Sequence, residues 1–419
     1  MNISFAVISD IHLKSKTTKD EKKFKKALEV INRLRPELDA MIIAGDITHG
    51  GKKSEYVKFE NIYNEYGNPN AERIFVMGNH DYWNGLPIKM AQKRFREFTG
   101  GLIHSHKIIK GFHFISVSTE GRWRDGHFTS KLLKWVKERL EIAKNDDPKK
   151  PIFFTVHQHI KGTVYGSEEW SNKSFYNVLK DYPQVVTFTG HSHHPLNDPR
   201  SIHQRDFTSI GTASVSYIEM EKGKVNGSIP PRADEFSQGL LISVSEDNKV
   251  IIEALDFVNE KIISTPWVLE DIGDKSKFKY TDDRYKCGIK PYFKGKMVKL
   301  KDVTSDSVTI IFNQGKHKDF IHSYKIEVIN KITGKIHKEF LAFSDFYLNK
   351  SKTKLSVKLT GLMKNTKYNL KIKALESFGH ESEDYLTATF ETMNKSRIKT
   401  ITDNIMLCVE YLFPSAQKR

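Results

Sequence analysis

The chain has 419 residues, of which 38% are hydrophobic and 28% are charged. This composition is typical of a folded globular protein, and the length exceeds what one core usually holds, so we expect two or three domains rather than a disordered chain. The formal net charge of +16 raises the question of a nucleic-acid partner.

Cysteine usage and hydropathy exclude several classes of protein. Cys287 and Cys408 are the only cysteines and lie far apart, so neither a disulfide framework nor a thiolate metal site is indicated. No apolar stretch approaches the length of a membrane span. The apolar run at residues 3–9 has no basic leader and leads directly into charged residues, which predicts a first strand rather than a signal peptide. We therefore expect a cytoplasmic protein.

Residues 1 to about 190 alternate apolar runs with amphipathic stretches. The runs predict strands at 3–9, 38–46, 73–79, 104–109, 111–118, 151–157 and 184–191. The stretches between them predict helices at 24–34, 52–66, 87–98, 132–143 and 174–179. Continuous apolar strands alternating with helices indicate a buried, mostly parallel sheet. Strand then follows strand from about 200 to 260, which predicts a second sheet packed on the first.

The last third of the chain has a different pattern. Residues 220–236 mix Gly, Pro and charge and predict a long loop or lid, and residues 273–289 predict a linker. Short alternating strands then follow within residues 290–393, at the turn spacing of an all-β immunoglobulin-like sandwich. This segment resembles a fibronectin type III domain, with Tyr368 at the position of that family's corner tyrosine.

A terminal helix is expected within residues 394–419, where apolar residues recur at helical spacing, and it could mediate packing or self-association. The positive charge is concentrated in residues 276–419, which carry 28 Lys and Arg against 15 Asp and Glu. Solvated strand faces explain this excess more simply than a surface that binds a polyanion. Nucleic acid is therefore a possible but not a favoured partner.

Side chains that bind metals follow five of the predicted strands. They are Asp10, His12, Asp46, Asn79, His157, His191 and His193. Because the carboxyl ends of parallel strands share one edge of a sheet, these residues can meet in one crevice. A single such residue is more often a cap or turn former, but a converging set needs compensation, which divalent cations provide. The oxygen and imidazole ligands suit two cations bridged by a carboxylate.

The ordered motifs DxH, GDxx, GNHD, H and GHxH over residues 10–193 resemble the calcineurin-like metallophosphoesterase superfamily. The resemblance covers about residues 1–272 and implies two packed mixed sheets flanked by helices. It implies that Asp10, His12 and His193 hold one metal ion. It also implies that Asn79, His157 and His191 hold the other, with Asp46 as the bridge. Manganese, iron and zinc all accept this ligand set.

Two cations of this kind lower the pKa of a shared water, so a bridging hydroxide is the expected nucleophile. His80 lies next to Asn79 and is the expected general acid that protonates the leaving group. Asp81 is expected to orient His80. A structural role for His80 is the alternative.

The second motif distinguishes possible substrates. Protein phosphatases of the superfamily have GDxVDRG, whereas this chain has His49 and Gly50 in place of that Asp and Arg. The motifs look more like the cyclic-nucleotide phosphodiesterase branch, so a small nucleotide-type diester is the expected substrate. A nuclease, a phosphomonoesterase and, more remotely, a binding protein that uses the sandwich are the alternatives. The candidate substrate contacts are Tyr82, Trp83, His49, His159, Arg122 and Arg124.

Overall fold

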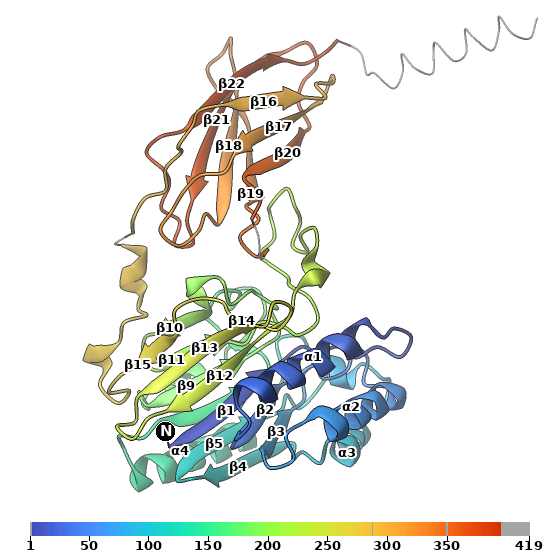
Figure 1. The fold of residues 1–419 in the computed structure, drawn as a ribbon, viewed down its shortest axis with the longest axis vertical. Coiled ribbons are helices and arrows are strands. Elements are labelled where there is room, and N and C mark those ends of the chain that lie inside the picture. The colour runs from blue at the N-terminus through green and yellow to red at the C-terminus, as the bar shows by residue number, and fades with distance from the viewer. Residues whose placement is uncertain (1, 287, 349–350, 395–419) are drawn as a thin grey trace, which may run out of the picture. The chain divides into compact units, whose positions relative to one another are not determined.

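The computed structural model describes residues 2–286, 288–348 and 351–394. It divides into two compact units (Figure 1). The first comprises residues 1–221 and 228–286, and the second comprises residues 222–227 and 287–419. In the described part of the chain, no helix combines the length and the apolar character that a membrane span requires.

The first unit contains two mixed sheets. One has the strand order β14-β13-β12-β1-β2-β3, with β15 also paired to β13, and the other has the order β10-β11-β9-β6-β5-β4. The strands of the first sheet are β1 (Ile3–Ile8), β2 (Ala40–Ala44), β3 (Glu72–Val76), β12 (Gln238–Val244), β13 (Val250–Asp256), β14 (Lys261–Ile262) and β15 (Trp267–Leu269). Those of the second are β4 (His104–Ile109), β5 (Phe112–Val117), β6 (Ile152–Val156), β9 (Val185–Thr189), β10 (Ile202–Gln204) and β11 (Thr208–Gly211).

The two sheets pack face to face through a cluster of phenylalanines. Phe5 of β1 makes edge contacts with Phe114, Phe153 and Phe188 of the second sheet, with ring centroids 4.7 to 5.8 Å apart. Every residue of β1, β2, β6 and β9 is buried. Burial of both faces explains why these strands read as continuous apolar runs.

Helices cover the outer faces. α1 (Lys19–Leu34), α2 (Lys53–Tyr66) and α3 (Ile88–Thr99) share one core with the first sheet, whereas α4 (Ser130–Asp146) and α5 (Tyr176–Leu179) share another with the second. The apolar stripe of α1 (Phe24, Ala27, Leu28, Ile31) is buried as its spacing predicts. The predicted α/β class with two packed mixed sheets is confirmed.

The assignment of strands to sheets differs from the expectation. The parallel strands of residues 1–190 are divided between the two sheets: β1, β2 and β3 lie in one, and β5, β6 and β9 in the other. β12 and β13 do not start a second sheet but extend the first, with β12 antiparallel to β1 and β13 antiparallel to β12. Hydrophobic periodicity identifies strands but does not specify which strands pair.

The second unit is a sandwich of two antiparallel sheets, β16-β17-β20 and β19-β18-β21-β22. The strands are β16 (Val298–Lys301), β17 (Ser307–Asn313), β18 (Ser323–Asn330), β19 (Ile336–Phe343), β20 (Lys354–Thr360), β21 (Lys367–Leu375) and β22 (Leu386–Glu391). Apolar residues alternate toward one core, as in β20, where Leu355, Val357 and Leu359 are buried. The predicted all-β sandwich is confirmed, whereas the helix expected at 394–419 lies almost entirely outside the described residues.

Two connecting segments differ from their expected roles. Residues 222–227 of the expected lid belong to the second unit, where the Val225 N–H donates to the Leu341 carbonyl over 2.7 Å. Most of the expected linker belongs to the first unit and contains the short helices η4 (Lys275–Lys277) and η5 (Asp282–Tyr285). Arg284 anchors it by donating to the carbonyls of Pro199 and Ile202. The weak hydrophobic periodicity of residues 273–289 therefore correctly indicated irregular structure, but most of this segment packs against the first unit instead of acting as a free linker.

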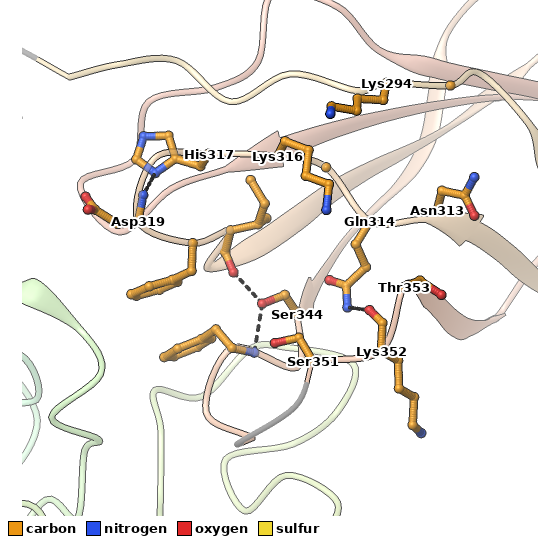
Figure 2. Close-up of a pocket in the computed structure, with 15 residues that line it drawn as sticks. Lys294, Asn313, Gln314, Lys316, His317, Asp319, Ser344, Ser351, Lys352 and Thr353 are labelled. Carbon is orange, nitrogen blue, oxygen red and sulfur yellow. Dashed lines mark hydrogen bonds between the residues drawn. The ribbon is translucent and has the colours of Figure 1, made fainter. Parts of the chain in front are cut away.

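The second unit contains a cavity of about 470 Å³, and Figure 2 shows the residues that line it. Three lysines border it: Lys294, Lys316 and Lys352. All three are exposed on the surface of the sandwich. The cavity includes none of the predicted site residues.

The corner tyrosine of the sandwich yields a test of its stability. The Tyr368 hydroxyl is buried and accepts from the Met363 N–H over 3.0 Å. Tyr368→Phe leaves that donor unsatisfied, which we expect to cost about 1 to 3 kcal/mol. Hydrogen exchange of β20 and β21 should accelerate by about 5- to 150-fold, because 1.4 kcal/mol corresponds to tenfold. Tyr385→Phe, at a 47% exposed tyrosine, is the control and should change little; equal effects would contradict the assignment.

Candidate metal centre

The loops that follow β1, β2, β3, β6 and β9 bring the predicted ligands together. β1, β2 and β3 run parallel, as do β6 and β9, so the loops that follow them lie at common sheet edges. Two fully buried groups could each hold one ion: Asp10, His12 and His193, and Asp46, His157 and His191. A third, partly exposed group consists of His12, His49 and His80.

The two groups are adjacent. His193 Nε2 lies 3.1 Å from Asp10 Oδ1, and His157 Nε2 lies 3.2 Å from Asp46 Oδ2. His157 Nε2 is also 4.0 Å from Asp10 Oδ1. Asp46 Oδ2 lies 3.8 Å from His12 Nε2 in the first group, so its carboxylate is near both groups. This proximity suits a bridging ligand.

Hydrogen bonds to the backbone orient two of the histidines. His157 Nδ1 lies 2.8 Å from the Ala44 carbonyl, and His193 Nδ1 lies 3.1 Å from the Tyr217 carbonyl. A carbonyl can only accept, so each Nδ1 carries a proton and each Nε2 faces the cluster, where its lone pair can bind a cation when the ring is neutral. Imidazoles held in this way are ready to bind a cation.

Unpartnered polar atoms support the same assignment. Buried ligand atoms without a hydrogen-bond partner in the described structure are Asp10 Oδ1, Asn79 Oδ1, His157 Nε2 and His191 Nε2. Buried polar atoms rarely lack partners because their desolvation is costly. Asn79, an uncharged oxygen donor next to His80, thereby stays a candidate ligand. The residues present fit a site for two cations.

The backbone at the ligands is strained. Asp10, His12, Asp46, His191 and His193 all have φ between 50° and 74°, in the left-handed region. Residues other than glycine seldom adopt this conformation, and it persists where the surrounding structure enforces it, often at functional sites. The strain turns these side chains toward the common centre.

The glycine that precedes each of three ligands leaves room for another ligand. A Cβ at Gly45 would lie 2.4 Å from the His157 ring, and one at Gly190 would lie 2.5 Å from Asp10 Oδ2. A Cβ at Gly78 would lie 2.1 Å from Asp46 Oδ1. The Gly in GD, GN and GH therefore permits close packing between loops, beyond any need for a turn.

Burial and charge together set the pKa values in the cluster. Burial alone would raise the pKa of Asp10, but His193 and His157 outweigh it and hold that pKa well below its usual value. Burial alone would lower the pKa of His157, but Asp46 and Asp10 raise it to about 9. Burial lowers the pKa of His12 to about 4. The two carboxylates are thus ionised and the cluster has a strong affinity for positive charge.

His80 lies beside the cluster, as predicted, but its partner differs. Its Nδ1 lies 2.8 Å from the His49 carbonyl, and its Nε2 lies 4.0 Å from Asp46 Oδ2. Asp81 does not orient it. The Asp81 carboxylate instead accepts from the N–H groups of Thr48 and Gly78 and from the Thr48 hydroxyl. Asp81 therefore joins the GD and GNHD loops, and the expected pairing with His80 is wrong.

The predicted substrate contacts differ in their burial, so that only some of them could reach a ligand. Tyr82 is buried at 3% exposure and its hydroxyl donates to the Thr119 carbonyl, so it belongs to the core and cannot stack on a ligand. Trp83 is 39% exposed, with its ring centroid 3.6 Å from that of His80. His159 is buried between Thr189 and Ser192, below the His191 loop. His49 is exposed near His12 and His80.

Arg122 and Arg124 lie on the loop after β5, and the structure adds two aromatic neighbours that the sequence did not reveal. The Arg124 guanidinium lies 5.3 Å from the centre of the Trp170 ring, and that ring lies 5.4 Å from the His191 ring. The centroid of the Tyr217 ring lies 4.4 Å from that of the His193 ring. Neither aromatic residue lies in a metal-ligand motif, so spacing gave no signal for them.

Comparisons with known proteins agree with this site. The model of the calcineurin-like phosphoesterase family matches residues 3–195. A probable cyclic nucleotide phosphodiesterase of Ruthia magnifica subsp. Calyptogena magnifica is 25% identical over 204 residues, which are 46% of this chain and 79% of that protein. A 3′,5′-cyclic-nucleotide phosphodiesterase of Nostoc sp. (strain PCC 7120) is 23% identical over 233 residues, 51% of this chain and 79% of that protein.

Among solved structures, purple acid phosphatase PPD1 from yellow lupin (Lupinus luteus) seeds is 13% identical with a TM-score of 0.46, covering 64% of this chain and 55% of its own. The FN5 domain of Drosophila Lar is 19% identical with a TM-score of 0.18, covering 26% and 98%. By the family model, residues 3–195 are similar to the calcineurin-like phosphoesterase domain. The predicted resemblance is confirmed for this domain.

The glycine contacts predict a variant that loses metal. Gly78→Ala forces the Asp46 carboxylate from its place, so we expect the metal content of the purified protein to fall from about two ions per chain to below one. Elemental analysis by mass spectrometry after dialysis measures this. Gly50→Ala is the matched control, because the atoms nearest its Cβ lie 3.7 Å away. Retention of both ions in Gly78→Ala would contradict the packing argument.

Proposed function

We propose that this protein is a dinuclear-metal phosphodiesterase that acts on a small nucleotide-type substrate such as a cyclic nucleotide. The observation that carries the proposal is the pair of adjacent buried ligand groups, with His80 at their edge and Asp46 near both. Asp10, His12 and His193 would hold one cation. Asn79, His157 and His191 would hold the other.

Two such cations, of manganese, iron or zinc, would supply an activated water and offset the charge that develops on the phosphoryl group. The chain supplies the rest. The His49 carbonyl accepts from His80 Nδ1–H, so Nε2 faces the cluster, and in the doubly protonated ring the Nε2–H can donate its proton to the leaving oxygen. Asp81 holds the two loops that carry Asp46 and Asn79 in register.

The choice of a diester rests on charge and on the relatives. A diester carries one negative charge fewer than a monoester, and the GDITHGG loop lacks the arginine that protein phosphatases use there. Both curated relatives are described as cyclic nucleotide phosphodiesterases. These relatives support the substrate class. At 25% and 23% identity they do not specify a particular nucleotide.

A substrate panel tests the proposal. The metal-loaded protein should hydrolyse aryl diesters and 2′,3′- or 3′,5′-cyclic nucleotides faster than aryl monoesters, and a chelator should abolish turnover. Raising salt from 50 to 200 mM should leave cyclic nucleotide turnover nearly unchanged, whereas polynucleotide binding that neutralises many phosphates would weaken by about 10³- to 10⁵-fold. Faster monoester turnover, or activity confined to polynucleotides with that salt dependence, would contradict the proposal.

The role of His80 predicts a dependence on the leaving group. His80→Ala should lower kcat by about 10²- to 10⁴-fold for a cyclic nucleotide, whose alkoxide leaving group needs a proton. An aryl diester with an activated leaving group should lose much less. The half-buried His337 of the sandwich lies outside the candidate ligand loops and provides a control, so His337→Ala should be neutral. Equal losses on both substrates would remove His80 from the role of general acid.

A further inference from the structure

One edge of the metal centre is lined by aromatic residues and one loop. Trp83 packs on His80, and its indole N–H donates to the Arg122 carbonyl over 3.3 Å. Arg124, two residues on, lies over Trp170, which packs edge-on against His191. Trp83, residues 122–124 and Trp170 are called the aromatic rim below. The rim connects the proposed proton donor with a proposed metal ligand.

Both halves of the aromatic rim are held in place. The loop after β5 is closed where the Glu120 N–H donates to the His127 carbonyl over 2.8 Å, and a turn from Trp123 to Gly126 presents Arg124 at its tip. Trp170 directly precedes β8 (Ser171–Asn172), which pairs in parallel with β7 (His159–Ile160) after the proposed ligand His157.

The side chain of Asn172 fixes this pairing. It donates to the carbonyls of Gln158 and His159 over 3.1 and 2.9 Å. The Trp170 side chain is half-buried. Its position is therefore set by β-pairing rather than by a free loop.

The charge of Arg124 is not paired by any residue that the structure describes. Its side chain is exposed and, among the residues that the structure describes, has no ion-pair partner. With two divalent cations bound, the two buried carboxylates leave the centre positive, and a further guanidinium nearby adds repulsion. An anion bound between the cations and the guanidinium removes this repulsion. A phosphate matches the guanidinium geometry, since two N–H groups can bind two oxygens.

We infer that Arg124 grips the substrate phosphate and that Trp170 is the residue that positions it. This inference rests on the proposed function, because the anion is the phosphate of that substrate. It places the gripping arginine on the loop after β5 instead of in the second motif, where this chain has Gly50. The Trp170 ring links the guanidinium to the metal centre, because it makes a cation–π contact with Arg124 and packs against His191.

Binding of inorganic phosphate to the metal-loaded protein, measured by calorimetry, tests the inference without turnover. Arg124→Ala should raise the Kd by about 10- to 150-fold, the value of a charged hydrogen bond. Trp170→Ala should raise it by about 2- to 30-fold, and Trp170→Phe, which keeps an aromatic face, should restore most of the affinity. KM for the diester should follow the Kd, while kcat stays nearly constant.

Arg73 provides the matched control. Its guanidinium lies 4.7 Å from the centre of the Tyr63 ring, so it is also a stacked arginine, but it lies at the beginning of β3, away from the loops that carry the ligands. Arg73→Ala should leave the Kd unchanged. An Arg124→Ala variant with the affinity of Arg73→Ala would overturn the inference.

Metal content separates positioning from support of the metal site. All these variants should keep the metal content of the unsubstituted protein. Loss of metal in Trp170→Ala would overturn the inference, because Trp170 would then act by supporting His191. If the protein hydrolysed no phosphoester while phosphate binding still depended on Arg124, the inference would stand and the proposed function would fail.

Discussion

The structure of the first unit depends on the burial of two carboxylates among imidazoles at the end of two sheets. Asp10 and Asp46 are almost completely inaccessible to solvent, and burial of an ionised carboxylate is costly unless positive charge compensates it. His157, whose pKa the two carboxylates raise to about 9, supplies part of that charge when it is protonated. Cations would supply it fully and would displace this proton. The strained loops and close glycine contacts follow from the need to bring these groups together.

The chemistry of the site could be predicted from the sequence because it is carried by short motifs after recognisable strands. Asp10, His12 and His193 lie together in the structure, as do Asp46, His157 and His191. Parallel strands place their following loops at one edge, so residues far apart in sequence meet without detailed knowledge of the sheet order. For this reason the error in assigning strands to sheets did not affect the predicted ligands.

Predictions failed where tertiary packing decides the role of a side chain. Asp81 and Tyr82 adjoin the motif residues, yet one bonds to neighbouring loops and the other lies in the core. Conversely, Trp170 reaches the site through the pairing of β7 with β8, and Tyr217 reaches it through a loop beside His193. Proximity to a motif along the chain therefore predicted site contacts that Asp81 and Tyr82 do not make, and it did not identify Trp170 and Tyr217. Hydrophobic pattern also revealed the sandwich, whose alternating strands need no site to be recognised.

We propose that five loops form one site for two neighbouring cations, and anomalous diffraction from crystals of the metal-loaded protein can locate them. Two ions should lie about 3.5 to 4 Å apart. Asp10, His12 and His193 should bind one of them, Asn79, His157 and His191 should bind the other, and Asp46 should contact both. A single ion, or two ions that share no ligand, would contradict it.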